Sequence, residues 1–227
     1  MEHGRRANGF TLIEVMVVVG IIAVVATLAV LSLDDWMRHQ RIKEAARGAA
    51  DMFTVARAEA IRTGTNQIVF FGVPGATDTA GTDLVDKQGN WVPLLILNDG
   101  APATANCQID NDEVTRTVFP IDDVSWGVSK ATTAAPDDGQ AAAFSPPQSS
   151  GRTFADPDGN QVNWIVFRPD GIPVTMSFSA GDCDEFGSTG SGSAALYLTN
   201  GDRDYAVVLS ALGGIRIHRW QGAGWSN

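Results

Sequence analysis

The sequence has few of the residues on which enzyme and metal sites usually depend. Its 227 residues include only two cysteines, Cys107 and Cys183, and three histidines, His3, His39 and His218. The cysteines lie far apart and form no C-x-x-C pair, which does not fit a structural zinc site. No G-x-S-x-G segment or Cys/His signature accompanies the histidines, and Asp and Ser without a known geometry identify no acid/base pair. We therefore expect a protein that is not an enzyme and that holds no metal or cofactor.

Positive charge is also scarce. The chain carries 16 Lys and Arg against 26 Asp and Glu, a net charge of −10 at pH 7. Such an acidic protein is a poor match for the phosphate backbone of nucleic acids as its main partner, although a local basic patch is not excluded. The length suits one well-buried domain with an additional segment, so we expect a single globular domain.

Near the N-terminus, charge is almost absent. Residues 10–33 contain Glu14 as their only charged residue. As one helix these 24 residues would span roughly 36 Å, enough to cross a hydrocarbon core of about 30 Å. A secretory signal peptide has a shorter apolar stretch followed by a small-x-small cleavage site, and a twin-arginine signal also fits poorly. Arg5 and Arg6 before the stretch predict a cytoplasmic N-terminus, with the chain after Leu33 on the far side of the membrane.

A carboxylate inside a membrane anchor needs an explanation. Glu14 would cost about 2.5–3.5 kcal/mol at the middle of a bilayer unless it has a partner. The stretch GFTLIE, residues 9–14, resembles the type III signal of type IV pilins and type II secretion pseudopilins. That resemblance implies that a prepilin peptidase cuts between Gly9 and Phe10 and methylates the new N-terminus at Phe10, so that Glu14 becomes the fifth residue of the mature chain. A passive, uncleaved signal anchor stays open as the simpler alternative.

Cleavage would create the missing partner for Glu14. The new α-amino group has a reference pKa of about 7.7–8.0 and is largely cationic at neutral pH. In a filament of staggered helices the amine of one subunit can meet the carboxylate of its neighbour, and such a pair would set the register of the helices. This chain has Leu31 at the place where the pilin family often has a proline, so we expect the helix to lack the kink that proline promotes.

The second half of the expected helix is amphipathic. In residues 34–64, apolar residues recur every three or four positions between charged ones, and no proline occurs from 10 to 63. Gly64 is a good helix terminator, so one helix should run from 10 to 63. The run TVARAEAIRTGTNQIVFF at 54–71, with FRPDG at 167–171 and GIR at 214–216, resembles the GspH/FimT branch of minor pilins and pseudopilins.

After residue 64 the sequence turns to β-structure. The fold class is therefore α+β: a long N-terminal helix, part transmembrane and part amphipathic, packed on an antiparallel β-sheet domain like that of pilins. Short turn motifs at 200–201 and 213–214 predict a three-stranded meander over 194–220. The expected strands are 67–71, 91–97, 114–119, 163–167, 174–178, 194–199, 205–209 and 215–220.

Three long polar stretches, 73–90, 129–160 and 179–193, separate these strands. Loops of this length are uncommon in compact domains and are either functional or poorly ordered. If the domain lies outside the cytoplasm, Cys107 and Cys183 are expected to form one disulfide, although spacing along the chain cannot show that their Cα atoms lie within about 7 Å of each other.

Two acidic segments only partly match a calcium loop. Asp156 and Asp158 occupy positions 1 and 3 of such a loop, but position 6 is Gln161 and position 12 is Phe167, where glycine and glutamate are required. The second segment, 182–185, is better explained as a solvated surface. We therefore expect no metal at either place.

The last strand carries a small basic patch. Period-2 alternation places Arg216 and His218 on one face of the strand 215–220, and Arg219 and Trp220 follow. Some members of the pilin family that this chain resembles act as DNA receptors in natural transformation through a basic C-terminal patch. DNA contact by Arg216, His218 and Arg219 is therefore an alternative function, and a solvent-facing strand edge with Trp220 packed back is the simpler interpretation.

These features together predict a minor pseudopilin or minor pilin that primes or caps a filament. The expected parts are a leader at 1–9, a transmembrane segment at 10–33, an amphipathic helix at 34–64 and a periplasmic β-rich domain at 65–227. The partners implied are the prepilin peptidase, the inner membrane and other pilins or pseudopilins. The sequence does not decide between a type II secretion pseudopilus and a type IV pilus.

Overall fold

A computed structural model describes residues 10–72, 81, 84, 94–99, 107, 115–118, 123–145, 151–179 and 182–226. In the short segments 28–32, 115–118, 178–179 and 182–185 it describes the backbone course and not the burial of the side chains. The expected leader 1–9, Gly9 included, and all but two residues of the expected loop 73–90 lie outside the described residues. The chain divides into two compact units, Met1–Gln40 and Arg41–Asn227, which are described separately.

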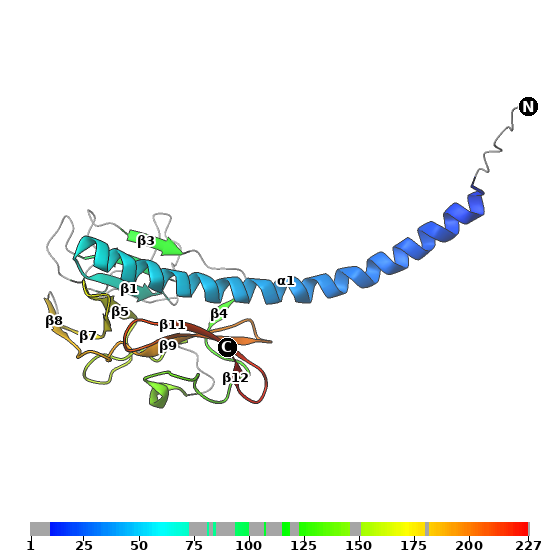
Figure 1. The fold of residues 1–227 in the computed structure, drawn as a ribbon. Helices are drawn as coiled ribbons and strands as arrows, with labels where there is room; N and C mark the ends of the chain where they lie inside the picture. The colour runs from blue at the N-terminus through cyan, green and yellow to red at the C-terminus, as the bar shows by residue number, and fades with distance from the viewer. Residues whose placement is uncertain are drawn as a thin grey trace, which may run out of the picture. The chain divides into compact units, whose positions relative to one another are not determined.

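The long helix α1 comes first along the chain, and the strands follow it with one short 3-10 helix, η1, between β4 and β5 (Figure 1). Their bounds are α1 Leu12–Thr63, β1 Gln67–Phe71, β2 Leu94–Asn98, β3 Thr115–Val118, β4 Ser125–Trp126, η1 Ala141–Ala143, β5 Trp164–Phe167, β6 Pro173–Val174, β7 Met176–Ser179, β8 Asp182–Phe186, β9 Ala194–Thr199, β10 Asp204–Leu209, β11 Ile215–Trp220 and β12 Trp225–Ser226.

The predicted long helix is present as α1. It ends at Gly64, which has a φ of +69° and donates its N–H to the carbonyl of Ala60 at 3.0 Å; this left-handed terminator is the conformation that glycine adopts most easily. Among the described residues, no helix combines the length and the apolarity that a membrane span requires. The transmembrane part of the helix, expected at 10–33, therefore stays a prediction.

In the second unit, α1 buries one face. Ile42, Ala46, Ala49, Phe53 and Ala56 recur at intervals of three or four residues and are at most 1% exposed, which is the spacing of a single helix face. The small alanines let the helix backbone approach the strands closely. This part of α1 packs on residues of β1, β5, β9 and β10, and together they form the main hydrophobic core.

Aromatic rings fill the centre of that core. The ring of Phe53 lies 6.1 Å from Phe71, and 6.2 Å from both Phe154 and Phe167. The pair with Phe71 is edge-to-face, an arrangement that aromatic quadrupoles favour. The helix, the first sheet and the segment around Phe154 are thus joined at one point.

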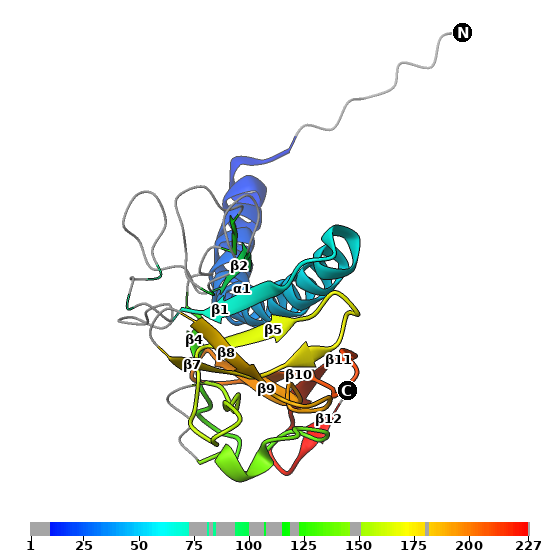
Figure 2. The same cartoon turned by 90° about the vertical axis from the view of Figure 1, so that its left-hand side faces the viewer.

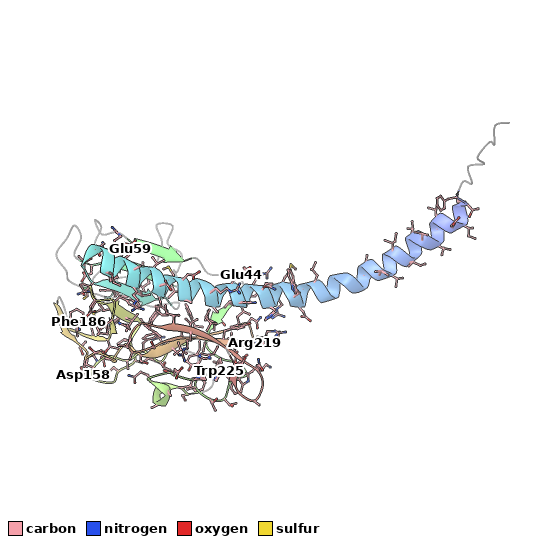
Figure 3. All side chains as sticks on the ribbon, in the orientation of Figure 1. Glu44, Glu59, Asp158, Phe186, Arg219 and Trp225 are labelled. Atoms are coloured by element: carbon pink, nitrogen blue, oxygen red, sulfur yellow. The ribbon has the colours of Figure 1, made fainter. Side chains whose placement is uncertain are left out.

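Two five-stranded sheets make up most of the second unit (Figure 2). Their strand orders are β3-β2-β1-β5-β6 and β12-β11-β10-β9-β4, and β7 pairs with β8 as a separate two-stranded sheet. All pairings among the described strands are antiparallel. The predicted α+β class and the predicted meander of β9, β10 and β11 are confirmed.

The central strands β1, β2, β5, β9 and β10 are buried on both faces of their sheets. In the second sheet, Leu196 and Val207 face the main core, whereas Tyr197 and Val208 face a second cluster that includes Val128, Ala131 and Ala135. The described part of the expected loop 129–160 therefore covers the sheet. This explains why so polar a stretch still contains buried apolar residues.

Two buried carboxylates hold this covering segment in place. Asp204 of β10 accepts the backbone N–H groups of Ser129, Lys130 and Ala131 at 3.0, 2.6 and 2.6 Å. Burial alone would raise the pKa of Asp204, but these hydrogen bonds and one from Thr199 outweigh it and lower the pKa.

The second of these carboxylates is Asp138, which lies on the covering segment itself. It accepts the hydroxyl of Tyr197 at 2.8 Å and the hydroxyl of Thr153 at 2.9 Å. Burial raises the pKa of Asp138 and the pKa of Tyr197.

Three predicted boundaries need correction. The expected loop 179–193 contains β8, whose acidic sequence opposed a strand prediction but which pairs with β7. The expected strand 174–178 is divided, since β6 pairs with β5 and β7 pairs with β8. The short strands β4 and β12 were not predicted, because two residues show no periodicity.

Candidate functional site

A side-chain cap defines the N-terminal end of α1. Thr11 precedes the first helical residue, and its Oγ1 accepts the backbone N–H of Glu14 at 3.3 Å. The carbonyl of Thr11 accepts the N–H of Val15, also at 3.3 Å. Thr11 is therefore the N-cap, and Glu14 is the third helical residue. This role of Thr11 was not predicted, although the T-x-x-E spacing of a capping box was present in the sequence as a signal.

Glu14 lies where the helix favours a negative charge. The unpaired N–H groups and the macrodipole make the first turn of a helix electropositive. Phe10, the predicted first residue of the mature chain, is 82% exposed directly before the cap.

The apolar side chains of the first helical turns are exposed as well. Every large apolar side chain among residues 12–25 is exposed to solvent in the first unit. A continuous apolar surface of this extent marks a membrane or protein contact.

The structure separates the three residues of the predicted basic patch. Arg216 is 64% exposed on its side chain and forms an ion pair with Asp137. His218 is only 3% exposed, because it shares the outer face of the sheet with Ala206, which the covering segment buries. Arg219 points to the opposite face, since side chains alternate along a strand. DNA contact stays a prediction, and the structure leaves His218 inaccessible to it.

One comparison with known proteins finds a match at the N-terminus. Residues 4–30 match the prokaryotic N-terminal methylation motif, the hallmark of type IV pilins and pseudopilins. The chain carries the processing signal of type IV pilins and pseudopilins. No solved structure matches the chain. The matched range includes Gly9, Phe10 and Glu14, the residues on which the predicted processing and pairing of this pilin-like precursor depend.

Three separate segments of the chain meet at Arg57. Its Nη1 donates to the carbonyl of Gly213, in the turn before β11, at 2.9 Å. A Cβ built on Gly213 would lie 3.2 Å from the guanidinium and 3.0 Å from the carbonyl oxygen of Gly171, in the turn after β5. We call Arg57, Gly171 and Gly213 the Arg57 corner. Two of the segments that resembled the GspH/FimT branch, 54–71 and 167–171, are thus brought together in space, and Gly213 directly precedes the third segment, 214–216.

The cysteines are only partly described. Cys107 is buried and disulfide-bonded, and its backbone N–H donates to Oδ1 of Asp99 at 3.0 Å. The other cysteine of the chain is Cys183 on β8, and the burial of its side chain lies outside the described part. Pairing of Cys107 with Cys183 stays our proposal.

The acidic loop at 156–160 forms a tight turn. Asp156 accepts the backbone N–H of Asn160 at 2.7 Å, and Asp158 accepts the hydroxyl of Ser177 at 3.3 Å. In the described part of the chain, no three His, Cys, Asp or Glu residues are grouped so that they could hold a metal ion.

Proposed function

We propose that this chain is a minor pseudopilin or minor pilin of the GspH/FimT type, and that it acts by assembly rather than by turnover. The observation that carries the proposal is the placement of Glu14. It lies in the first, capped turn of a helix with an apolar exposed surface, within the methylation motif and four residues after Phe10. Prepilin peptidase would cut between Gly9 and Phe10 and methylate Phe10.

The chemistry of Glu14 explains why an acid is tolerated in such a helix. Cleavage releases an α-amine with a reference pKa of about 7.7–8.0, which is mostly cationic at neutral pH. A carboxylate buried among packed helices needs a counter-charge, and the amine of a neighbouring subunit supplies one. Before assembly, residues 10–33 hold the subunit in the inner membrane, with the β-rich domain in the periplasm. After assembly, the same apolar surface lies between helices of the filament.

The choice of the GspH/FimT branch rests on the Arg57 corner. Its three segments come from the end of α1, from the turn after β5 and from the turn before β11. Their contact joins two of the resembling sequences directly and reaches the residue before the third, 214–216, which gives a structural reason for a chain to carry them together. The filament is a type II secretion pseudopilus or a type IV pilus, and other pilins or pseudopilins are the partners.

The ion pair between Glu14 and the α-amine of a neighbouring subunit can be tested by expressing Glu14→Val in the cells that make the protein. Removing one partner of a buried ion pair typically costs about 3–5 kcal/mol, so we expect at least about a hundredfold less of the variant in sheared filaments. Membrane insertion should not suffer, because the variant removes a charge that is unfavourable in lipid. The measurement is quantitative blotting of the filament and membrane fractions.

Two controls accompany this experiment. Val15→Thr changes polarity in the same helical turn without removing the charge, and it should enter filaments at the level of the original chain. N-terminal sequencing of the membrane-extracted protein should give a methylated Phe10. Normal incorporation of Glu14→Val contradicts the pairing, and an intact Met1 contradicts the whole proposal.

A further inference from the structure

In the second sheet, the six-residue strand β11 lies between β10 and the short edge strand β12 (Figure 2). It pairs with β10 from Ile215 to Arg219, but with β12 only at Arg219 and Trp220. Among the described residues, no strand pairs with β11 from Ile215 to His218 on the side away from β10. An open strand edge presents backbone donors and acceptors to any extended chain.

The hydrogen-bond pattern shows which groups are open. The N–H of Ser210 donates to the carbonyl of Gly214 at 2.8 Å, which makes this a hydrogen-bonded pair of the β10–β11 ladder. In an antiparallel pair, hydrogen-bonded and non-hydrogen-bonded positions alternate. The backbone groups of Ile215, Ile217 and Arg219 therefore point away from β10, toward the outer edge.

β12 independently confirms this pattern. The N–H of Gln221 donates to the carbonyl of Gly224 at 2.8 Å, so the next hydrogen-bonded pair of this hairpin is Arg219 with Ser226. The backbone of Arg219 thus forms its hydrogen bonds with β12, as expected for a residue whose backbone groups point away from β10. Ile217 and Ile215 are the next two positions of a ladder that β12 has already begun.

The charges of β11 favour an acidic occupant. The open stretch 215–218 contains the exposed Arg216 and no acidic residue, in a chain with a net charge of −10. His218 in this stretch is buried, and Arg219 beyond it points to the opposite face and already pairs with β12. Arg216 is paired with Asp137, but both side chains are more than half exposed, and such pairs contribute little.

A second copy of the same strand is a poor occupant. Antiparallel pairing of two β11 edges centred on Arg216 would set the two Arg216 side chains opposite each other, and like charges directly opposite one another on paired strands are unfavourable. Two other sheet edges are less suitable: β6 begins with Pro173, which lacks a backbone donor, and β4 has only two residues.

We propose that the outer edge of β11 at residues 215–217 binds an extended acidic segment of another protein chain by strand addition. An antiparallel segment that continues the β12 ladder would bond to the backbone of Ile217 and Ile215. Its residue opposite Arg216 occupies a non-hydrogen-bonded position, where opposing side chains are closest. An acidic residue there, between apolar residues that face the side of Ile215 and Ile217, matches this edge. The proposal uses neither Glu14 nor residues 10–33, so it does not depend on filament assembly.

Binding can be measured with a short synthetic peptide of alternating glutamate and valine. The full chain is kept in detergent, and the fluorescence anisotropy of the labelled peptide is followed. We expect saturable binding that is lost when lysine replaces glutamate in the peptide. Ile217→Pro removes an outward donor without touching the β10 ladder and should weaken binding about tenfold. Ile217→Val keeps the donor and should bind normally.

Charge reversal decides the matter if Ile217→Pro does not fold. Arg216→Glu should prefer the lysine peptide over the glutamate peptide. Arg203→Glu changes an exposed arginine on a different hairpin and should leave the preference unchanged. The proposal is overturned if the glutamate peptide does not bind, in which case Arg216 only guards the edge. It is also overturned if Arg203→Glu reverses the preference as strongly as Arg216→Glu.

Discussion

Arg57 shows how one polar side chain can join segments that are far apart in the sequence. Its guanidinium lies against two turns, and one hydrogen bond to Gly213 fixes its position. A Cβ at Gly213 would lie 3.2 Å from the guanidinium, so close that the two groups would have to move apart slightly. At this residue the absence of a Cβ therefore favours the packing as well as the backbone conformation.

Replacing Gly213 by alanine should destabilise the domain. The residue has a φ of +79°, which costs a non-glycine residue about 1–2 kcal/mol, and the new Cβ would lie 3.0 Å from the carbonyl oxygen of Gly171. We expect a total loss of about 2–3 kcal/mol in the free energy of unfolding, measured by chemical denaturation.

Gly201→Ala is the matched control for this change. Gly201 has a φ of +87° in the β9–β10 turn, but a Cβ there would meet nothing within 4 Å. In this control the free energy of unfolding should fall only by the cost of a positive φ for a non-glycine residue. If the two variants are equally stable, the Arg57 corner makes no packing contribution and the argument from Gly213 is wrong.

At the scale of elements, the alanine-rich face of α1 decides how closely the helix approaches the sheets. Ala56 is fully buried in the main core, whereas Ala58 is exposed on the same helix. Ala56→Leu should destabilise the domain by about 1–3 kcal/mol, because a close-packed site cannot accept the added volume without strain. Ala58→Leu should stay within about 0.5 kcal/mol. Thermal unfolding followed by circular dichroism compares the two, and equal losses would contradict this packing model.

Most of these elements could be predicted from local signals. The helix could be followed because no proline interrupts it and Gly64 ends it, and β1, β9 and β11 have the predicted bounds because turn residues flank apolar runs. β8 could not be predicted from local signals, because its acidic residues are poor strand formers and only pairing with β7 makes it a strand.

The candidate sites were predictable to a similar degree. The N-terminal motif is contiguous in sequence, so Phe10 and Glu14 could be identified without a structure. His218 was expected beside Arg216 on an accessible face. Alternation gave the face correctly, but it could not show that residues 128–135 fold over that face. Burial by a segment some 80 residues away is a tertiary property.

Across the whole molecule, His218 is a weak point in a well-satisfied interior. Neither ring nitrogen of His218 has a hydrogen-bond partner in the described structure, and leaving such groups unpaired in a core is costly. Burial lowers the pKa of His218, and the charge of Arg216 adds to this, whereas Asp137 opposes it. The folded protein therefore resists a proton that the unfolded chain accepts.

The stability of the protein should consequently fall on mild acidification. Because the pKa of His218 is lower in the folded than in the unfolded chain, the unfolded state binds more protons once the pH drops below about 6.5, and the free energy of unfolding decreases. Above that pH both states are neutral and the loss disappears. Unfolding midpoints measured from pH 7.5 to 5.5 should decline for the original chain and stay nearly level for His218→Leu. His39→Gln, which removes the other histidine that remains after the predicted cleavage, should retain the decline. If the decline instead vanishes in His39→Gln and persists in His218→Leu, the pH dependence comes from His39 and the prediction for His218 is wrong.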